Sequence, residues 1–187
     1  VSELKKDNLS KSSIKLSIPL ELNNWKQSYN SPSHISLNYL SNSNFNKFKR
    51  IIRGKGEGSS EKILAQPVIS NNKLFFLDAL GNVYAFDLVK KKLDWKKNII
   101  LNNDKGHNIG GGLAVDENFL FIGSPYAEIF CLEINTGKIV WKNSTVTPVR
   151  ATPTLVDNKV IVLTLDNRTL VFEKENGSVI WEHQGIQ

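Results

Sequence analysis

The chain has 187 residues, of which 40% are hydrophobic and 22% charged, with a net charge of +6 and a pI near 9.3. This composition is typical of a soluble globular protein, and no apolar run is long enough to span a bilayer. The basic residues are scattered, with no recognition motif beside them, which argues against nucleic-acid binding. The single cysteine, Cys131, excludes a disulfide framework within the chain and is expected to be a small buried apolar residue.

Residues 1–22 are expected to form a flexible leader, because most of this segment is polar, charged and without a period. A short strand is expected within it, over Ile14–Leu22, where apolar residues alternate weakly. The chain begins at Val1 rather than Met and lacks the pattern of a signal peptide, so it is expected to be a processed chain or a fragment.

Residues 23–62 are expected to form an N-terminal loop and strand. The part from Trp25 to Ser43 is rich in Asn, Ser and Pro and is typical of a loop. A strand is predicted over Phe45–Arg53, followed by a flexible connection over Gly54–Ser60.

Three units of four short strands follow, at residues 63–107, 108–147 and 148–187. The last unit has the clearest pattern, with strands predicted at Ala151–Val156, Lys159–Thr164, Arg168–Glu173 and Ser178–His183. These strands are rich in Val, Ile, Leu and Thr, and pairs of Asp, Asn and Gly that favour tight turns separate them.

The three units are repeats of one pattern. Each ends on a tryptophan, at Trp95, Trp141 and Trp181, with spacings of 46 and 40 residues. Upstream, the apolar stretches that begin at Leu74, Phe119 and Val160 align. A period near forty residues made of four strands is typical of a β-propeller blade. The prediction is therefore an all-β fold, a β-propeller of four-stranded antiparallel blades, of which about three are present here.

The blade pattern assigns structural roles to several residues. Gly137 and Gly177 stand at the tip of the last hairpin of their blades, where a positive φ is required. The first blade has Lys91 there, so its turn is expected to be strained or differently built. The three tryptophans are expected to cover the junctions between neighbouring blades. A tryptophan that lines a ligand site is the alternative.

No catalytic, cofactor-binding or metal-binding residue is predicted, and the chain is not expected to be an enzyme. The glycine-rich stretch Gly106–Gly112 lacks the Lys-Ser/Thr ending of a phosphate loop and precedes a strand, so close packing near the propeller axis accounts for it better. The three histidines lie in separate segments without ligand spacing, and no nucleophile motif is present.

The blade endings EINTGKIVW and EKENGSVIW resemble the pyrroloquinoline-quinone-type propeller repeat. The wider chain, over about residues 23–187, resembles the family of the outer-membrane protein assembly factor BamB, in its alphaproteobacterial form. The stretches that carry this resemblance are Trp25–Gln27 with Pro32–His34, Gly56–Ser60, Gly110–Asp116 and Thr147–Val160.

The resemblance implies an eight-bladed propeller on a periplasmic lipoprotein, of which this chain is an N-terminal fragment. Such a protein is not an enzyme and needs no cofactor. It is a scaffold at the periplasmic face of the bacterial outer membrane, where it binds the barrel-forming subunit of the outer-membrane assembly complex, the BAM complex. It aids the insertion of outer-membrane proteins, and these proteins in their unfolded form are a second candidate partner. It meets the membrane only through a lipid anchor whose cysteine is not in this sequence, and its N-terminal strand completes the last blade.

The resemblance also implies a partner-binding site. In the family, an exposed segment with aliphatic residues followed by Arg precedes the inner strand of the third blade, and Val149 and Arg150 match that place. Thr147 stands where another aliphatic residue is expected, and an ion pair at the blade edge is the alternative role for Arg150. The alternative function is a fragment of a quinone-dependent dehydrogenase or another ligand-binding propeller. The dehydrogenase would need a calcium site of acidic and amide side chains and a cofactor stacked on a tryptophan.

Overall fold

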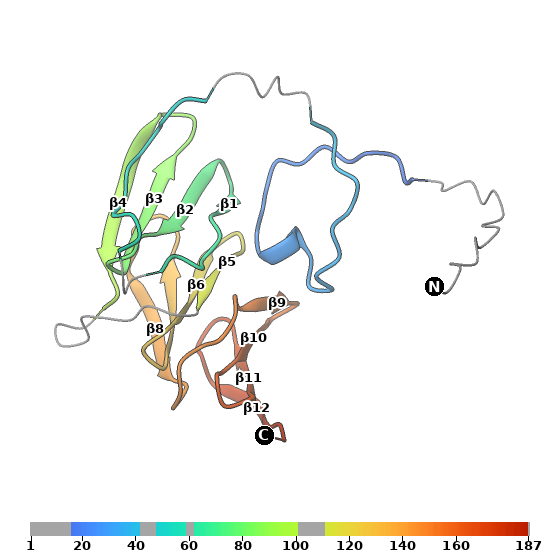
Figure 1. Cartoon of the computed structure of the whole chain (residues 1–187), viewed down its shortest axis with the longest axis vertical. Coiled ribbons are helices and arrows are strands. Elements are labelled where there is room, and N and C mark those ends of the chain that lie inside the picture. The colour runs from blue at the N-terminus through green and yellow to red at the C-terminus, as the bar shows by residue number, and fades with distance from the viewer. Residues whose placement is uncertain (1–15, 42–47, 59–61, 101–110, 187) are drawn as a thin grey trace, which may run out of the picture.

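The structure is a computed structural model that describes residues 16–41, 48–58, 62–100 and 111–186. It contains three separate four-stranded antiparallel sheets, each paired in chain order (Figure 1). The first sheet is made of β1 (Val68–Ser70), β2 (Lys73–Leu77), β3 (Asn82–Asp87) and β4 (Lys92–Asn98). The second is made of β5 (Gly112–Val115), β6 (Phe119–Ser124), β7 (Glu128–Glu133) and β8 (Ile139–Ser144). The third is made of β9 (Thr154–Val156), β10 (Lys159–Leu163), β11 (Arg168–Glu173) and β12 (Val179–Gln184).

These sheets are propeller blades, which confirms the predicted fold class. Their innermost strands β1, β5 and β9 lie toward the N-terminal segment, and the outermost strands β4, β8 and β12 lie away from it (Figure 1). Within the described ranges, no helix is long and apolar enough to cross a membrane.

The three blades share one pairing register. In each blade a residue of the second strand lies opposite one of the third, which in turn lies opposite the tryptophan: Phe75–Ala85–Trp95, Phe121–Cys131–Trp141 and Ile161–Val171–Trp181. An irregularity of the β-bulge kind follows the third-strand residue in every blade. A register that is shared together with its bulge identifies the blades as copies of one unit.

This register corrects the sequence alignment by one residue. Leu74 and Val160 correspond to Leu120 in the second blade, because these three residues lie opposite Phe86, Phe172 and Leu132 at equivalent positions. The sequence prediction had placed Phe119 there. Apolar residues follow one another without alternation in the sequences of these strands, so a shift of one position leaves the apolar pattern unchanged.

Two apolar cores lie between consecutive blades. Phe75 and Val83 of the first blade pack with Leu120 and Ile122 of the second. Phe121 and Trp141 of the second blade pack with Val160, Val162 and Phe172 of the third. Cys131 is fully buried in the second core, which confirms its expected role as an apolar residue, and burial raises the pKa of its thiol.

Trp95 and Trp141 each lie on a glycine of the following blade. The indole N–H of Trp95 donates to the carbonyl of Ile134 at 2.9 Å, and that of Trp141 donates to the carbonyl of Lys174 at 2.7 Å. A Cβ atom at Gly137 would lie 2.7 Å from the ring of Trp95, and one at Gly177 would lie 2.5 Å from the ring of Trp141. Both glycines also have positive φ, of 68° and 73°. These positions therefore require glycine for two independent reasons.

Two members of the repeat depart from this arrangement. Lys91 stands where the other blades have glycine and adopts a φ of 54°, so a side chain is held in the left-handed region. Trp181 is 51% exposed, whereas Trp141 is 8% exposed, because no described residue covers its ring as the third blade covers Trp141.

We expect Gly137→Ala to lower the free energy of unfolding by about 2–4 kcal/mol, since the new methyl group meets the Trp95 ring and the positive φ disfavours alanine. Chemical denaturation measures this change. Gly56→Ala is the control, because nothing lies within 4 Å of a Cβ atom there, and it should change stability by less than about 0.5 kcal/mol. Equal stability of the two variants would contradict the proposed contact.

The N-terminal segment bonds the innermost strand of each blade in turn. Trp25 pairs with Ile69 of β1 through two backbone hydrogen bonds of 2.8 and 2.9 Å. The carbonyl of Lys26 accepts the N–H of Val115 of β5 at 2.7 Å. The side-chain oxygen of Gln27 accepts the N–H of Leu155 of β9 at 2.7 Å. Three consecutive residues thus satisfy donors of three successive blades, which the sequence prediction of a loop did not include.

We expect Gln27→Ala to cost about 1–3 kcal/mol of stability, because it leaves the N–H of Leu155 without its partner in a buried position. Thermal or chemical unfolding measures the effect. The matched control is Asn24→Ala, which removes an exposed side-chain bond to the N–H of Asn71 and should have a much smaller effect. A loss at Gln27 no larger than that at Asn24 would show that water replaces the amide.

The remaining N-terminal predictions are resolved in part. The leader over residues 1–15 lies outside the described residues. Of the strand predicted over Ile14–Leu22, Leu20 forms a single parallel bridge with Tyr39. Of the strand predicted over Phe45–Arg53, residues 48–53 are described and have no regular secondary structure. The segment between the loop and the first blade instead contacts a turn, through the carbonyl of Lys55, which accepts the N–H of Ala79 at 3.1 Å.

Candidate functional site

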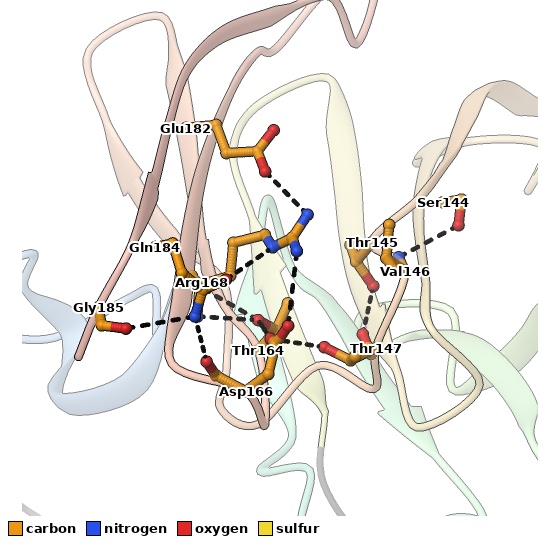
Figure 2. Close-up of polar contacts among 10 residues, drawn as sticks. All are labelled: Ser144, Thr145, Val146, Thr147, Thr164, Asp166, Arg168, Glu182, Gln184 and Gly185. Carbon is orange, nitrogen blue, oxygen red and sulfur yellow. Dashed lines mark hydrogen bonds and ion pairs between the residues drawn. The ribbon is translucent and has the colours of Figure 1, made fainter. Parts of the chain in front are cut away.

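The candidate site is the connection between the second and third blades, from the end of β8 at Ser144 to Arg150, together with the turn between β10 and β11. Figure 2 shows the first part of this connection, residues 144–147, beside the turn. The connection runs antiparallel to the start of this turn. The N–H of Arg150 donates to the carbonyl of Leu163, and the N–H of Leu165 donates to the carbonyl of Pro148, at 2.7 and 2.9 Å. Val149 lies directly opposite Thr164. Because opposite residues of an antiparallel pair share a face and neighbours alternate, Val149 and Arg150 face opposite ways.

Val149 is a core residue. Its side chain is fully buried in the apolar core between the second and third blades, 2.6 Å from where a Cβ of Gly123 would lie. Its N–H donates to the carbonyl of Ser124, and its carbonyl accepts the N–H of Gly111. The exposed position implied for Val149 by the resemblance is therefore wrong. The alternation along the segment explains this, since the residue beside an exposed Arg must point inward.

Arg150 is exposed, as expected for a contact residue. Its guanidinium donates one hydrogen bond, from Nη1 to the side-chain oxygen of Asn167 at 3.2 Å. Within the part of the chain that the structure describes, no carboxylate lies within 4.0 Å of it, so the expected alternative of an ion pair at the blade edge is not found there. A guanidinium that donates to one neutral amide keeps most of its donors for a partner.

A second arginine nearby has its charge neutralised. Arg168 donates from Nη1 to Glu182 at 2.8 Å, and its Nη2 lies 3.7 Å from Asp166 (Figure 2). Its Nε also donates to the side chain of Gln184 at 3.3 Å. Arg168 thus joins β11 to β12 and the turn, and the positive charge left for a partner at this end of the blade is that of Arg150.

Asp166 holds the connection to the turn. Its Oδ1 accepts hydrogen bonds from the hydroxyls of Thr164, at 2.5 Å, and Thr147, at 2.7 Å (Figure 2). These bonds, first that of Thr164 and then that of Thr147, hold the pKa of the Asp166 carboxyl below its ordinary value, with a further contribution from the charge of Arg168. Thr147 therefore has a structural role at the position where the resemblance implies an aliphatic residue.

Val146 forms the tip of the connection. The N–H of Thr147 donates to the carbonyl of Thr145 at 2.7 Å, and Val146 between them has a φ of 66°. This is a γ-turn with positive central φ, the rarer and more strained of the two γ-turn forms. Such a conformation costs about 1–3 kcal/mol for a residue other than glycine, and most for a β-branched one. The side chain of Val146 is nevertheless 68% exposed, so burial does not compensate for the strain.

An axial cleft with a volume of about 270 Å³ adjoins Arg150. It lies between the N-terminal segment and the start of the inner strands, and its lining includes Ser28, His34, Gln66 and Thr152. His34 bonds the hydroxyl of Thr154 at 3.1 Å. Residues 106–110 of the glycine-rich stretch lie outside the described residues. Among those described, no group of three His, Cys, Asp or Glu side chains is placed to hold a metal ion.

The sequence predicted one of the residues that shape this site. Arg150 was found through the resemblance, whereas Val146, Asp166 and Arg168 were not. Nothing in the sequence marks Val146, because a positive φ at a β-branched residue has no compositional signal. The Asp166–Asn167 pair was identified only as a turn.

We expect Asp166→Asn to destabilise the protein at neutral pH and to have a smaller effect in acid. The pKa of Asp166 is lowered on folding, so its ionised form contributes stability above pH 3.8, the ordinary value, and this stability is lost as the pH falls through the lowered pKa. Unfolding measured between pH 7 and pH 2 should show the two proteins converging in acid. A constant difference over this range would assign the effect to packing instead of charge.

The chain is similar in sequence to known protein families. Residues 95–187, just under half of the chain, match the family model described as outer membrane protein assembly factor BamB. The chain is 27% identical over 129 residues to an uncharacterized protein of Rickettsia prowazekii, a match that covers 68% of this chain and 31% of that protein. The chain thus spans about a third of the length of this relative and of a second one from Rickettsia conorii.

More distant relatives divide between two kinds of protein. One is the outer membrane protein assembly factor BamB of Moranella endobia, 21% identical over 53% of this chain and 27% of that protein. Another is the 1-butanol dehydrogenase (cytochrome c) of Thauera butanivorans, 24% identical over 56% of this chain and 17% of that protein. Among solved structures, a europium-containing methanol dehydrogenase superposes with a TM-score of 0.70 at 19% identity, covering 86% of this chain and 32% of that one. This likeness shows the fold.

Proposed function

We propose that this chain is part of a non-catalytic scaffold at the periplasmic face of the bacterial outer membrane. The scaffold binds the barrel-forming subunit of the outer-membrane β-barrel assembly machinery and aids the insertion of outer-membrane proteins, with unfolded outer-membrane proteins as a second partner. It is held at the membrane by a lipid anchor outside this sequence. The match of residues 95–187 to the BamB family model supports this function.

Arg150 is the observation that carries the proposal for this chain. It is a surface cation at the connection between two blades, with one neutral hydrogen-bond partner among the described residues. Arginine is enriched at protein interfaces because its planar guanidinium can bind a carboxylate through two parallel hydrogen bonds. The backbone of Arg150 is fixed by its bond to Leu163, so little backbone entropy is lost when a partner binds.

The surface proposed to bind the partner is supported by packed strands and by hydrogen bonds. The strands of the two blades are packed into the core, and the connection is bonded to the turn through Thr147 and Asp166. A contact residue on such a support keeps one geometry before and after binding. The role proposed for the propeller is therefore to hold loops in fixed positions for a protein partner.

Binding of the full-length protein to the barrel-forming subunit tests the function directly. Both proteins are purified and their affinity is measured by biolayer interferometry or calorimetry. A saturable one-to-one complex is the expected result. Absence of any complex with the folded subunit would overturn the proposal.

We expect Arg150→Glu to weaken this complex by at least about tenfold, because it replaces the free cation with a charge of opposite sign. The matched control is Lys159→Glu, an exposed charge reversal in the same blade, at the start of β10 and at the opposite end of that strand. It should change the affinity by less than about twofold. Equal effects of the two variants would assign the loss to net charge and would remove Arg150 from the interface.

A quinone-dependent dehydrogenase, or another ligand-binding propeller, is the second candidate. The 24% identity to a 1-butanol dehydrogenase favours it, and the fold is compatible with it. Titration of the full-length protein with pyrroloquinoline quinone and calcium, followed by absorption spectroscopy, separates the two functions. Stoichiometric uptake of the quinone would favour the dehydrogenase, and an unchanged spectrum together with binding of the barrel-forming subunit would favour the scaffold.

A further inference from the structure

We propose that Val146 is the apolar anchor of this interface, in place of the buried Val149, and that it enters an apolar pocket on a folded protein partner whose rim carries a carboxylate for Arg150. This inference rests on the proposed function and deepens it. It assigns the apolar contact to a residue that the family resemblance does not indicate.

The conformation of Val146 is unfavourable and its side chain is unused within the described chain. A valine with a φ of 66° is a genuine outlier for a β-branched residue. A glycine or asparagine would form the same turn with little strain. The side chain is 68% exposed and belongs to neither apolar core. The side chain gains nothing from burial among the described residues, and strained backbone positions cluster at binding sites, so we assign its contribution to a contact with a partner.

The turn is held rigidly on both sides (Figure 2). The hydroxyl of Thr145 donates to the carbonyl of Thr147, and the hydroxyl of Thr147 donates to Asp166. The N–H of Thr145 donates to the carbonyl of Ala127 at 2.8 Å, and the side chain of Thr145 is fully buried. A stem fixed in this way presents the tip in one position. Because little conformational entropy remains to be lost, a single apolar side chain can contribute usefully to affinity.

The polar groups of the tip favour an apolar pocket over a polar one. The N–H of Val146 donates to the hydroxyl of Ser144 at 3.2 Å, and the N–H of Thr147 is used inside the turn. Two donors that a partner could bind are therefore already satisfied. What the tip offers is chiefly its two methyl groups, which a shallow apolar pocket on a folded surface would desolvate.

The charge of Arg150 indicates a second property of the partner surface, a carboxylate beside the apolar pocket. Arg150 is four residues along the same extended segment, so its Cα lies at most about 14 Å from that of Val146. Both residues thus fall within one interface of ordinary size, about 800 Å² on each partner. The free guanidinium of Arg150 is complementary to a carboxylate, and the net charge of +6 disfavours a second copy of the same chain at this position.

Val146→Gly separates a binding role from a folding role, because the two roles predict opposite results. Glycine relieves the strain, so the melting temperature should stay the same or rise. It also removes the anchor, so the affinity of the full-length protein for the barrel-forming subunit should fall at least about tenfold. Val146→Asn should behave in the same way, since asparagine tolerates the turn. Val146→Ile should retain affinity within about threefold, because it keeps a β-branched apolar side chain.

Two controls match these variants. Lys91→Gly relieves strain at a φ of 54° in the first blade and should raise stability without any change in affinity. Val89→Gly removes another valine that is about equally exposed, in the turn between β3 and β4 at the opposite end, and should also leave the affinity unchanged. A photoreactive phenylalanine analogue introduced at position 146 should cross-link to the folded subunit.

The outcomes distinguish the inference from the function on which it rests. If the wild type binds the subunit and Val146→Gly binds equally well, the anchor is overturned while the scaffold function stands. If position 146 cross-links only to a second copy of the protein or to an unfolded outer-membrane protein, the pocket on a folded partner is overturned. If the wild type does not bind the subunit at all, the proposed function fails and the anchor fails with it.

Discussion

Packing of a tryptophan ring onto the glycine turn of the next blade is the contact on which this structure depends. Neighbouring sheets meet through side chains near the axis, but toward the periphery the sheets need a large group to remain in contact. The ring of Trp141 fills this position between the second and third blades and bonds the carbonyl of Lys174. Burial of a ring of this size is worth on the order of 4–6 kcal/mol. The glycine that receives the ring also closes the turn, so one residue serves both the hairpin and the blade interface.

Because the strands are used for packing between blades, the blades can differ in length only in the connections between them. The spacing from the second strand to the tryptophan is the same in all three blades, and the longer interval between Trp95 and Trp141 arises in the connection after the first blade. Connections can vary because they carry few core contacts. Specific recognition by such a propeller is therefore expected at its connections, and Arg150 and Val146 both lie in one of them.

The sequence predicted the repeat well and the site poorly, for physical reasons. Turn residues, β-branched runs and the tryptophans are properties of the chain itself, so the four-stranded blades could be inferred from them. The exact strand alignment could not, because the apolar runs of these strands lack alternation in sequence, and Phe119 was aligned in place of Leu120. Val149 was expected to be exposed, whereas its side chain points inward. The direction of that side chain depends on the backbone pairing of Val149 with Thr164, and this pairing cannot be read from the sequence. The strain at Val146 depends on backbone geometry alone and leaves no trace in composition.

The N-terminal segment adds a constraint on the centre of the propeller. Backbone donors at the inner edge of a sheet must be satisfied, by water, by a ligand or by the chain. Here Trp25, Lys26 and Gln27 bond one inner strand each, and Gln27 does so with a side chain that imitates the backbone. The backbone N–H groups of the inner strands at these positions are thereby satisfied by the protein's own N-terminal segment. Toward the ends of the blades, by contrast, Arg150 keeps donors that no described residue uses and Val146 an exposed side chain, as the proposed scaffold role requires.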